Sequence, residues 1–189
     1  MTFSAVLLAG GQSRRMGSNK ATVFFEREPL WQRQLRLLRD LDLQNIFVSA
    51  QNEQSWRPRD TELLLDEVPS RGPMSGICAA LTRMKTSHLL VLAVDMPFVT
   101  AQDLLSLVSL TKVECGVVPV TKECAEPLAA TYPKESCQEF MAALSSSDTS
   151  LQKVIRQLAE MGKLTLMQLS PAEIERYRSV NTPDDLLDT

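Results

Sequence analysis

The chain has 189 residues, of which 44% are hydrophobic and 23% are charged, and its formal net charge at pH 7 is −3. This length and composition predict a single soluble globular domain over residues 1–189, large enough to bury a full core. The negative charge balance excludes a general attraction to nucleic acid or to an anionic membrane surface, so we expect neither as a partner.

The cysteines and the first apolar run predict a cytoplasmic protein. Cys78, Cys115, Cys124 and Cys137 form no C-x-x-C pair, so the sequence indicates neither a zinc site nor a redox motif. We expect reduced and mostly buried thiols, although an even number of cysteines leaves disulfides open. The first apolar run is too short for a signal peptide and follows no basic leader, and no run approaches transmembrane length.

The first predicted element is a strand over residues 5–9, because so short and unbroken an apolar run is typical of a strand buried on both faces. Gly10 and Gly11 follow it, where the backbone can turn and approach a ligand closely. With Arg15 and Lys20 nearby, the exposed N–H groups of this loop favour polyphosphate binding over a basic surface loop. The loop contains neither G-x-x-x-x-G-K-[ST] nor G-x-G-x-x-G, which excludes two familiar phosphate motifs.

The next segments predict a short hairpin, a helix and two strands. A small apolar patch at 23–25 indicates the hairpin or a loop, and Pro29 suits the first position of the helix. Leucines recur on one stripe of that helix as far as Leu41. Apolar runs at 46–48 and 63–65 predict strands, with a polar loop between them.

The second half of the chain continues the alternation. The segment 72–76 indicates a turn that runs into a helix, and the most continuous apolar run, 89–94, predicts a buried strand that ends at Asp95. Pro97 blocks continuation of that strand, and Thr100 suits the cap of the next helix. Further strands are expected at 117–120, 127–132 and 164–169, and further helices at 135–144, at 150–161, from Pro171 and from Thr182.

This alternation of strands and helices predicts an α/β fold, in which helices cover both faces of a mainly parallel sheet. In such sheets, ligands bind beyond the carboxyl ends of the strands. Gly10, Asp66 and Asp95 each come close after a predicted strand. We therefore expect these three residues to lie at one edge of the sheet.

The charged residues at this edge point to phosphate and metal chemistry. Asp95 is costly to bury after an apolar strand unless it is paired or binds a cation, and one carboxylate beside a phosphate site suits Mg²⁺. An ordinary turn aspartate is the alternative. Lys20 offers a point charge to a phosphate and Arg15 a bidentate one. Asp66 could accept hydrogen bonds from a nucleotide base or sugar, with a strand-end turn as its alternative.

Motifs along the whole chain resemble those of one enzyme family. The first stretch matches the L-A-G-G-x-S-x-R-M-G-x-x-K signature of nucleotidyltransferases. The later matches are shared more closely with the molybdenum cofactor guanylyltransferases, which the whole chain resembles. The matching residues are Leu8, Ala9, Gly10, Gly11, Ser13, Arg15, Met16, Gly17 and Lys20, then Pro29–Leu30, Gly72–Gly76, Val94–Phe98, Glu126–Leu128 with Tyr132, and Val180–Leu186.

The resemblance implies a three-layer α/β/α Rossmann-like nucleotidyltransferase fold. It also implies transfer of GMP from GTP to molybdenum-molybdopterin, which would give the guanine dinucleotide cofactor and pyrophosphate. Mg²⁺ is the implied cofactor. The implied partners are GTP, molybdenum-molybdopterin and the molybdoenzymes, or their chaperones, that receive the product.

The same resemblance assigns roles to individual residues. Leu8, Ala9, Gly10 and Gly11 would contact the nucleotide, Lys20 and Arg15 would act on its phosphates, Asp66 would be a nucleotide-binding acid, Asp95 the Mg²⁺ ligand, and Asn181 would lie on the pterin side. Ser49 departs from the family, because it stands where the family carries a nucleotide-contacting asparagine.

Two other functions are compatible with the sequence. One is a related nucleotidyltransferase that uses CTP or another phosphate acceptor, but the cytidylyl relatives resemble L-A-A-G where this chain has Gly10–Gly11. The other is a regulatory protein of the same fold that binds a nucleotide without catalysis. The joint presence of Arg15, Lys20 and Asp95 favours an enzyme, because a binding protein has no need of the metal ligand.

Overall fold

The computed structural model describes residues 1–10, 20–65, 70–146, 148–182 and 185. The predicted site residues Gly11, Arg15 and Asp66 lie outside the described residues, as does most of the helix expected from Thr182. A search of the described part of the chain finds no helix that is long and apolar enough to span a membrane.

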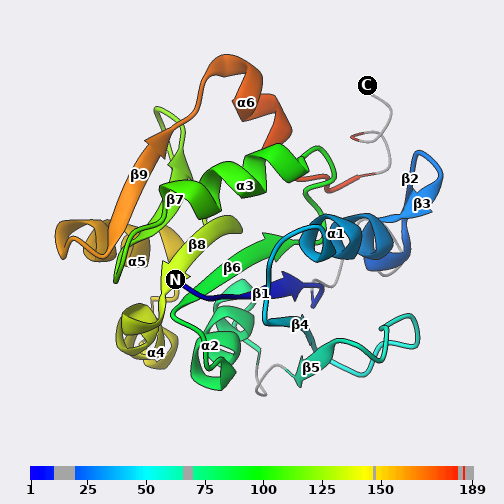
Figure 1. Cartoon of the computed structure of the whole chain (residues 1–189), viewed down its shortest axis with the longest axis horizontal. Helices are drawn as coiled ribbons and strands as arrows, with labels where there is room; N and C mark the ends of the chain where they lie inside the picture. Colours follow the sequence, from blue (N-terminus) through cyan, green and yellow to red (C-terminus); the bar gives the residue numbers. More distant parts are fainter. Residues whose placement is uncertain (11–19, 66–69, 147, 183–184, 186–189) are drawn as a thin grey trace.

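A seven-stranded sheet in the order β5-β4-β1-β6-β8-β7-β9 forms the middle of the molecule (Figure 1). Only β8 runs antiparallel to its neighbours, and the other pairs in the sheet are parallel. The predicted α/β fold with a mostly parallel sheet is thus confirmed. The strands of the sheet are β1 (Phe3–Leu8), β4 (Asn45–Ala50), β5 (Glu62–Leu65), β6 (His88–Ala93), β7 (Gly116–Val120), β8 (Ala129–Pro133) and β9 (Leu164–Gln168).

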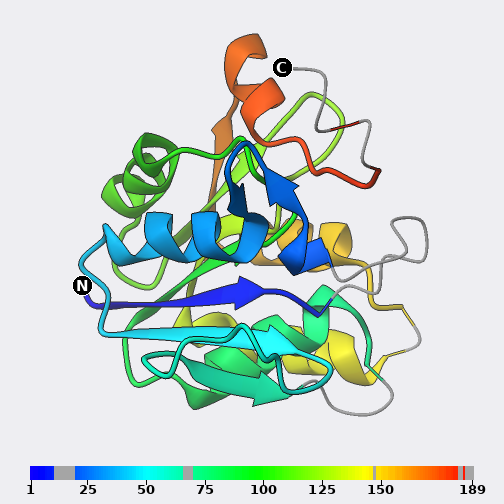
Figure 2. The same ribbon diagram turned by 90° about the vertical axis from the view of Figure 1, so that its right-hand side faces the viewer.

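Helices cover both faces of the sheet and complete the three-layer arrangement. Helices α1 and α3 bury their apolar faces in one core cluster, and α2, α4 and α5 bury theirs in a second. Figure 2 shows α1 and α2 on opposite sides of β1. The helices are α1 (Leu30–Arg39), α2 (Pro73–Arg83), α3 (Ala101–Leu110), α4 (Cys137–Ser145), α5 (Leu151–Glu160) and α6 (Pro171–Arg176), with 3₁₀ turns η1 (Lys20–Thr22) and η2 (Lys134–Ser136).

The two central strands are buried along their whole length. Every residue of β1 and of β6 is buried, and β1 pairs in parallel with β4 on one side and β6 on the other. Each fully buried Val or Leu side chain contributes roughly 1.5–3 kcal/mol through the hydrophobic effect. This burial makes the ends of β1 and β6 fixed points from which the following loops are positioned.

Two expectations need correction. The strand expected at 127–132 begins at Ala129, because Pro127 lies in a turn where its carbonyl accepts a hydrogen bond of 2.8 Å from the Tyr132 hydroxyl. All the cysteines are free, as expected, but only Cys78 is buried. The other three lie before a strand, in a loop and at a helix start, where fewer elements surround a side chain.

The short hairpin is confirmed as β2 (Phe24–Phe25) and β3 (Glu28–Pro29).

Candidate active site

The carboxyl ends of β1, β4 and β6 meet at one edge of the sheet. Leu8 at the end of β1 is in register with Ser49 of β4 on one side and with Ala93 of β6 on the other. Gly10 and Asp95 each follow two residues later. The expected co-location of these two residues is therefore confirmed, whereas Asp66 lies outside the described residues.

Hydrogen bonds continue past the strand ends and hold the outgoing chain. The amide of Ala9 donates to the carbonyl of Ser49 at 2.8 Å, and the amide of Val94 donates to the carbonyl of Leu8 at 3.0 Å. The amide of Ala93 donates to the carbonyl of Leu128 at 2.8 Å. The backbone directly before Asp95 is therefore anchored to neighbouring segments as the chain leaves the sheet.

A pocket of about 100 Å³ opens at this edge. The start of α2 forms one wall, where Gly72 has a left-handed φ of 67° and Pro73 is the first helical residue. Further along, Gly76 lets α2 approach β1 and β4, since a Cβ at this position would clash with the side chains of Ser49 and Leu8. The pocket is lined by Leu8, Gly10, Lys20, Ser49, Gly72, Pro73, Ala93, Val94, Asp95 and Leu128.

Lys20 and Asp95 form an ion pair in this pocket. The Lys20 Nζ lies 2.8 Å from Oδ2 of Asp95, and the side chains are only 12% and 21% exposed. Nζ also donates to the carbonyl of Val180 at 3.0 Å and to Oδ1 of Asn181 at 2.9 Å. A lysine ammonium has three N–H donors, so all of them are engaged. The structure thus brings together three predicted site residues: Lys20, Asp95 and Asn181.

The donor set at the pocket fits a magnesium ion. Asp95 is the one acidic side chain among the described residues that line the pocket, and no group of three or more His, Cys, Asp or Glu side chains in the described ranges is placed so that it could hold a metal ion. Mg²⁺ is commonly held by one or two carboxylates, while substrate phosphates and water fill its other positions. A single aspartate beside Lys20 suits that arrangement better than a metal held by protein ligands alone.

The segment after α6 returns to the loop that carries Asp95, a contact that the sequence did not predict. The amide of Val180 donates to the backbone carbonyl of Asp95 at 2.8 Å. Just before it, the Arg178 guanidinium lies over the Phe98 ring, 4.1 Å from the centroid. The match of Val180–Leu186 to the ending of the resembled family was the one signal in the sequence that linked this tail to the site.

An ion pair between the half-exposed Arg176 and the buried Asp103 fixes the base of the returning segment. Arg176 contacts both carboxylate oxygens of Asp103, its Nη2 lying 2.7 Å from Oδ1 and its Nε 3.0 Å from Oδ2. Burial alone would raise the pKa of Asp103, but hydrogen bonds from Arg176 and Thr100 outweigh it and hold that pKa below its ordinary value. Asp103 also forms a capping box with Thr100 at the start of α3. One carboxylate therefore holds α3 and the C-terminal segment together.

Comparison with known proteins identifies the family. The sequence family described as the MobA-like NTP transferase domain matches residues 5–161. The chain belongs to this family. It is a nucleotidyltransferase, and a probable molybdenum cofactor guanylyltransferase from Opitutus terrae is 32% identical to it, over 97% of this chain and 92% of the relative. Such relatives place the chain among the nucleotidyltransferases of molybdenum cofactor biosynthesis.

Solved structures share the fold. The molybdopterin-guanine dinucleotide biosynthesis protein A from Archaeoglobus fulgidus is 24% identical, with a TM-score of 0.75 over 97% of this chain and 95% of that one. A 4-diphosphocytidyl-2C-methyl-D-erythritol synthase from Anaerococcus prevotii is 11% identical, with a TM-score of 0.73 over 98% and 93%. Proteins named for different products share the fold, so the fold alone does not select the nucleotide base.

Proposed function

We propose that this nucleotidyltransferase transfers GMP from GTP to molybdenum-molybdopterin, forming the guanine dinucleotide cofactor and releasing pyrophosphate. The observation that carries the proposal is the contact of Lys20 with both Asp95 and Asn181. This contact lies at the carboxyl edge of the sheet, where Gly10 follows β1. A phosphate-binding cation, a metal-binding carboxylate and a residue assigned to the acceptor side meet within hydrogen-bonding distance. The named relative from Opitutus terrae supports the choice of nucleotide and acceptor.

Each site residue has a role in this proposal. Leu8, Ala9, Gly10 and Gly11 would contact the nucleotide through their backbone, and Asp66 would bind its base or sugar. Lys20 and Arg15 would bind the phosphates, and Asn181 would face the pterin. Asp95 would hold Mg²⁺, which offsets negative charge on the nucleotide phosphates when it is bound.

The reaction requires no covalent intermediate with the protein. A terminal phosphate oxygen of the pterin attacks the α-phosphorus of GTP, and the bond between that phosphorus and the oxygen bridging to the β-phosphate breaks. The bond electrons leave with pyrophosphate. Catalysis of such a displacement rests on alignment and on charge neutralisation. Lys20 and Arg15 would supply positive charge for the departing pyrophosphate.

Phosphate binding to Lys20 must displace one of its three protein acceptors, and the Asp95 carboxylate is the one that a bound metal ion would take over. All three donors of Lys20 are engaged with protein acceptors, so a phosphate can bind Lys20 only by replacing one of them. Displacement of the Asp95 carboxylate also frees the oxygen that a metal ion would use. The ion pair therefore holds both side chains at the pocket, and each charge has a partner before the substrate binds.

The test is pyrophosphate release by the purified protein with GTP, Mg²⁺ and molybdenum-loaded pterin. We expect pyrophosphate to form only when all three are present, and the Asp95→Asn variant to abolish it while circular dichroism shows an intact fold. Binding of GTP without turnover of the wild type would favour the non-catalytic regulator. An Asp95→Asn variant with near wild-type turnover would make Asp95 an ordinary turn residue.

A further inference from the structure

Gln34, in the middle of α1, points its amide at the loop that carries Asp95. Its side chain is completely buried. Nε2 donates to the carbonyl of Met96 at 2.7 Å and, more weakly, to the carbonyl of Ala93 at 3.4 Å. Both partners are acceptors, so only the NH₂ end of the amide can face them. These two carbonyls lie before and after Asp95 in the sequence. Gln34 therefore links the two ends of the short segment that carries the metal-binding residue.

The loop is held from two sides. Beside Gln34 on α1, the Nε of Arg33 donates to the carbonyl of Pro97 at 2.7 Å. From the segment after α6, the amide of Val180 donates to the carbonyl of Asp95 itself at 2.8 Å. Four backbone carbonyls around Asp95 therefore accept hydrogen bonds from α1 or from the C-terminal segment. They are the carbonyls of residues 93, 95, 96 and 97.

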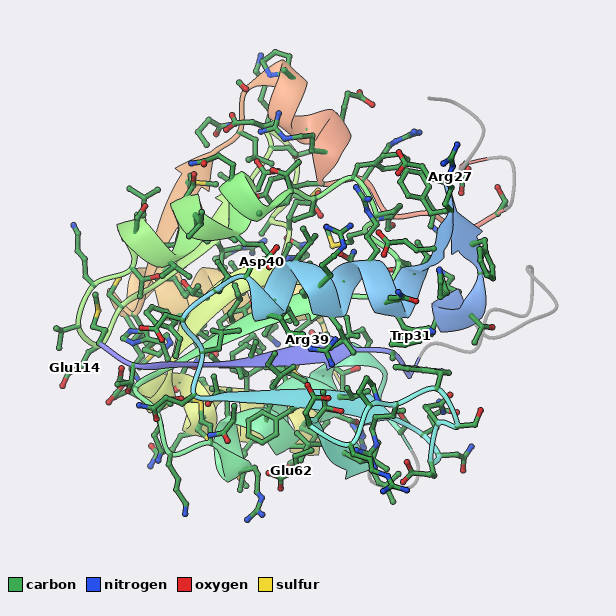
Figure 3. The ribbon with its side chains drawn as sticks, turned by 45° about the vertical axis from the view of Figure 1, so that its right-hand side comes forward. Arg27, Trp31, Arg39, Asp40, Glu62 and Glu114 are labelled. Carbon is green, nitrogen blue, oxygen red and sulfur yellow. The ribbon has the colours of Figure 1, made fainter. Side chains whose placement is uncertain are left out.

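The same helix is also tied to Lys20. The amide of Leu30, the first residue of α1, donates to the carbonyl of Val23, and the amide of Val23 donates to the carbonyl of Lys20. Figure 3 shows the end of α1 that carries Trp31 beside the β2–β3 hairpin. Helix α1 is therefore hydrogen-bonded to the segments that carry both partners of the ion pair, Lys20 and Asp95.

Packing alone does not account for an amide at this position. The neighbouring inward positions of α1 are Leu30, Leu35 and Leu38, all fully buried. The Oε1 of Gln34 is buried without a hydrogen-bond partner, which is an energetic cost that an apolar side chain would avoid. The amide is explained by its donors, which fix the direction of the carbonyls on each side of Asp95.

We propose that Gln34 is a positioning residue that sets the place of the Asp95 carboxylate for the metal–nucleotide complex. The inference rests on the proposed function, since Asp95 must hold a divalent cation for it to apply. Residues behind a metal ligand commonly alter metal affinity or activity by about 10- to 100-fold when they are changed. We expect loss of the Gln34 donors to act on the metal dependence of the site.

The test uses Gln34→Met, which keeps the length of the side chain and removes its donors. The first readout is the ratio of affinities for Mn²⁺·GTP and for GTP in the presence of a chelator, measured by calorimetry. The second is the Mg²⁺ concentration for half-maximal pyrophosphate release. We expect the affinity ratio to fall and the Mg²⁺ requirement to rise by about tenfold or more, with metal-free GTP affinity unchanged.

Leu38→Ala is the matched control, because it weakens the packing of the same helix without removing a hydrogen bond. We expect it to lower Tm and leave the affinity ratio unchanged. The proposal is overturned if Gln34→Met leaves the ratio and the Mg²⁺ requirement within twofold of wild type. It is also overturned if Leu38→Ala shifts both as much as Gln34→Met does.

A second variant and the wild type separate the remaining outcomes. If Gln34→Met does not fold, Gln34→Leu is measured in the same way, and failure of both to fold assigns Gln34 a structural role and overturns the proposal. Absence of turnover in the wild type would refute the proposed function, whereas the calorimetric ratio would still report on Gln34. Wild-type turnover with an unaltered ratio in Gln34→Met would refute the positioning role alone.

Discussion

At the scale of single residues, the pairing of Lys20 with Asp95 explains how two charges can lie in a small and largely covered pocket. Each charge is costly to desolvate alone, and each is neutralised by the other at 2.8 Å. The additional acceptors on Val180 and Asn181 leave no ammonium proton unpaired. A nucleotide phosphate can therefore take over an existing cation position without a large rearrangement of the backbone.

Lys20→Ala should weaken triphosphate binding and slow transfer. A charge-assisted hydrogen bond contributes about 1.5–3 kcal/mol, which corresponds to roughly a ten- to hundredfold loss of GTP affinity. Calorimetry of GTP binding, together with turnover, measures this loss. Removal of Lys20 also takes away the ion-pair partner that the structure describes for Asp95, so Tm should be compared with wild type. Unchanged GTP affinity and unchanged turnover would assign Lys20 to the ion pair alone.

At the scale of elements, the segment after α6 acts as a strap across the Asp95 loop. Its base is the Arg176–Asp103 pair, and its far end delivers Val180 to the backbone of Asp95 and Asn181 to Lys20. The strap joins α3, the loop after β6 and η1. Loosening its base should therefore affect the pocket, although the hydrogen bonds described for Arg176 go to Asp103 and Ala172 and not to residues that line the pocket.

Arg176→Met should lower stability modestly and weaken the hold on Asn181. Arg176 is more than a third exposed, so solvent screening limits the effect to about 1 kcal/mol or less. Asp103 keeps its hydrogen bonds with Thr100, which preserve the cap of α3. We expect a small fall in Tm and a rise in KM for the pterin substrate with little change in KM for GTP. Equal rises in both would contradict a local role for the strap.

The sequence predicted the local elements well because their signals are local. The buried strands β1 and β6 appear as apolar runs, and Gly10 and Asp95, which follow them, mark the ligand edge of the sheet. Three features could not be predicted: the antiparallel insertion of β8, the strap, and the role of Gln34. Each depends on contacts between residues far apart in the chain, and periodicity within a segment carries no information about them. No pattern in the sequence distinguishes Gln34 from the other polar residues of its helix.

At the scale of the whole molecule, stability should depend on pH through His88. His88 lies in the central strand β6, is buried, and packs against Phe3. Burial lowers the pKa of this imidazole below its ordinary value, while the Lys112 backbone and Glu135 act in the opposite direction. The neutral form is therefore favoured in the folded protein.

The sign of the pH effect follows from proton uptake. As the pH falls below about 6.5, the unfolded chain protonates His88 before the folded protein does, so the free energy of unfolding decreases. Above that pH, His88 contributes no further change. Tm of the wild type and of His88→Gln, measured from pH 5 to pH 7.5, should show a steeper loss for the wild type. Parallel curves would exclude His88 as the source.

The nucleotide is the part of the proposed function that the shared fold leaves undecided. Gly10–Gly11 stands where the cytidylyl relatives resemble Ala-Gly, and we expect the missing methyl group to leave room for a purine. Selection of guanine over adenine requires an acceptor for its N1–H and exocyclic amine, such as Asp66 or a backbone carbonyl. An acceptor left unpaired by ATP costs on the order of 1–3 kcal/mol, or about ten- to a hundredfold in affinity.

The most direct test is kcat/KM for GTP, ATP, CTP and UTP, measured with the same molybdenum-loaded pterin and Mg²⁺. We predict that GTP exceeds each of the other three by about tenfold or more. A kcat/KM for CTP equal to or greater than that for GTP would contradict guanylyl transfer and move the chain to the cytidylyl branch.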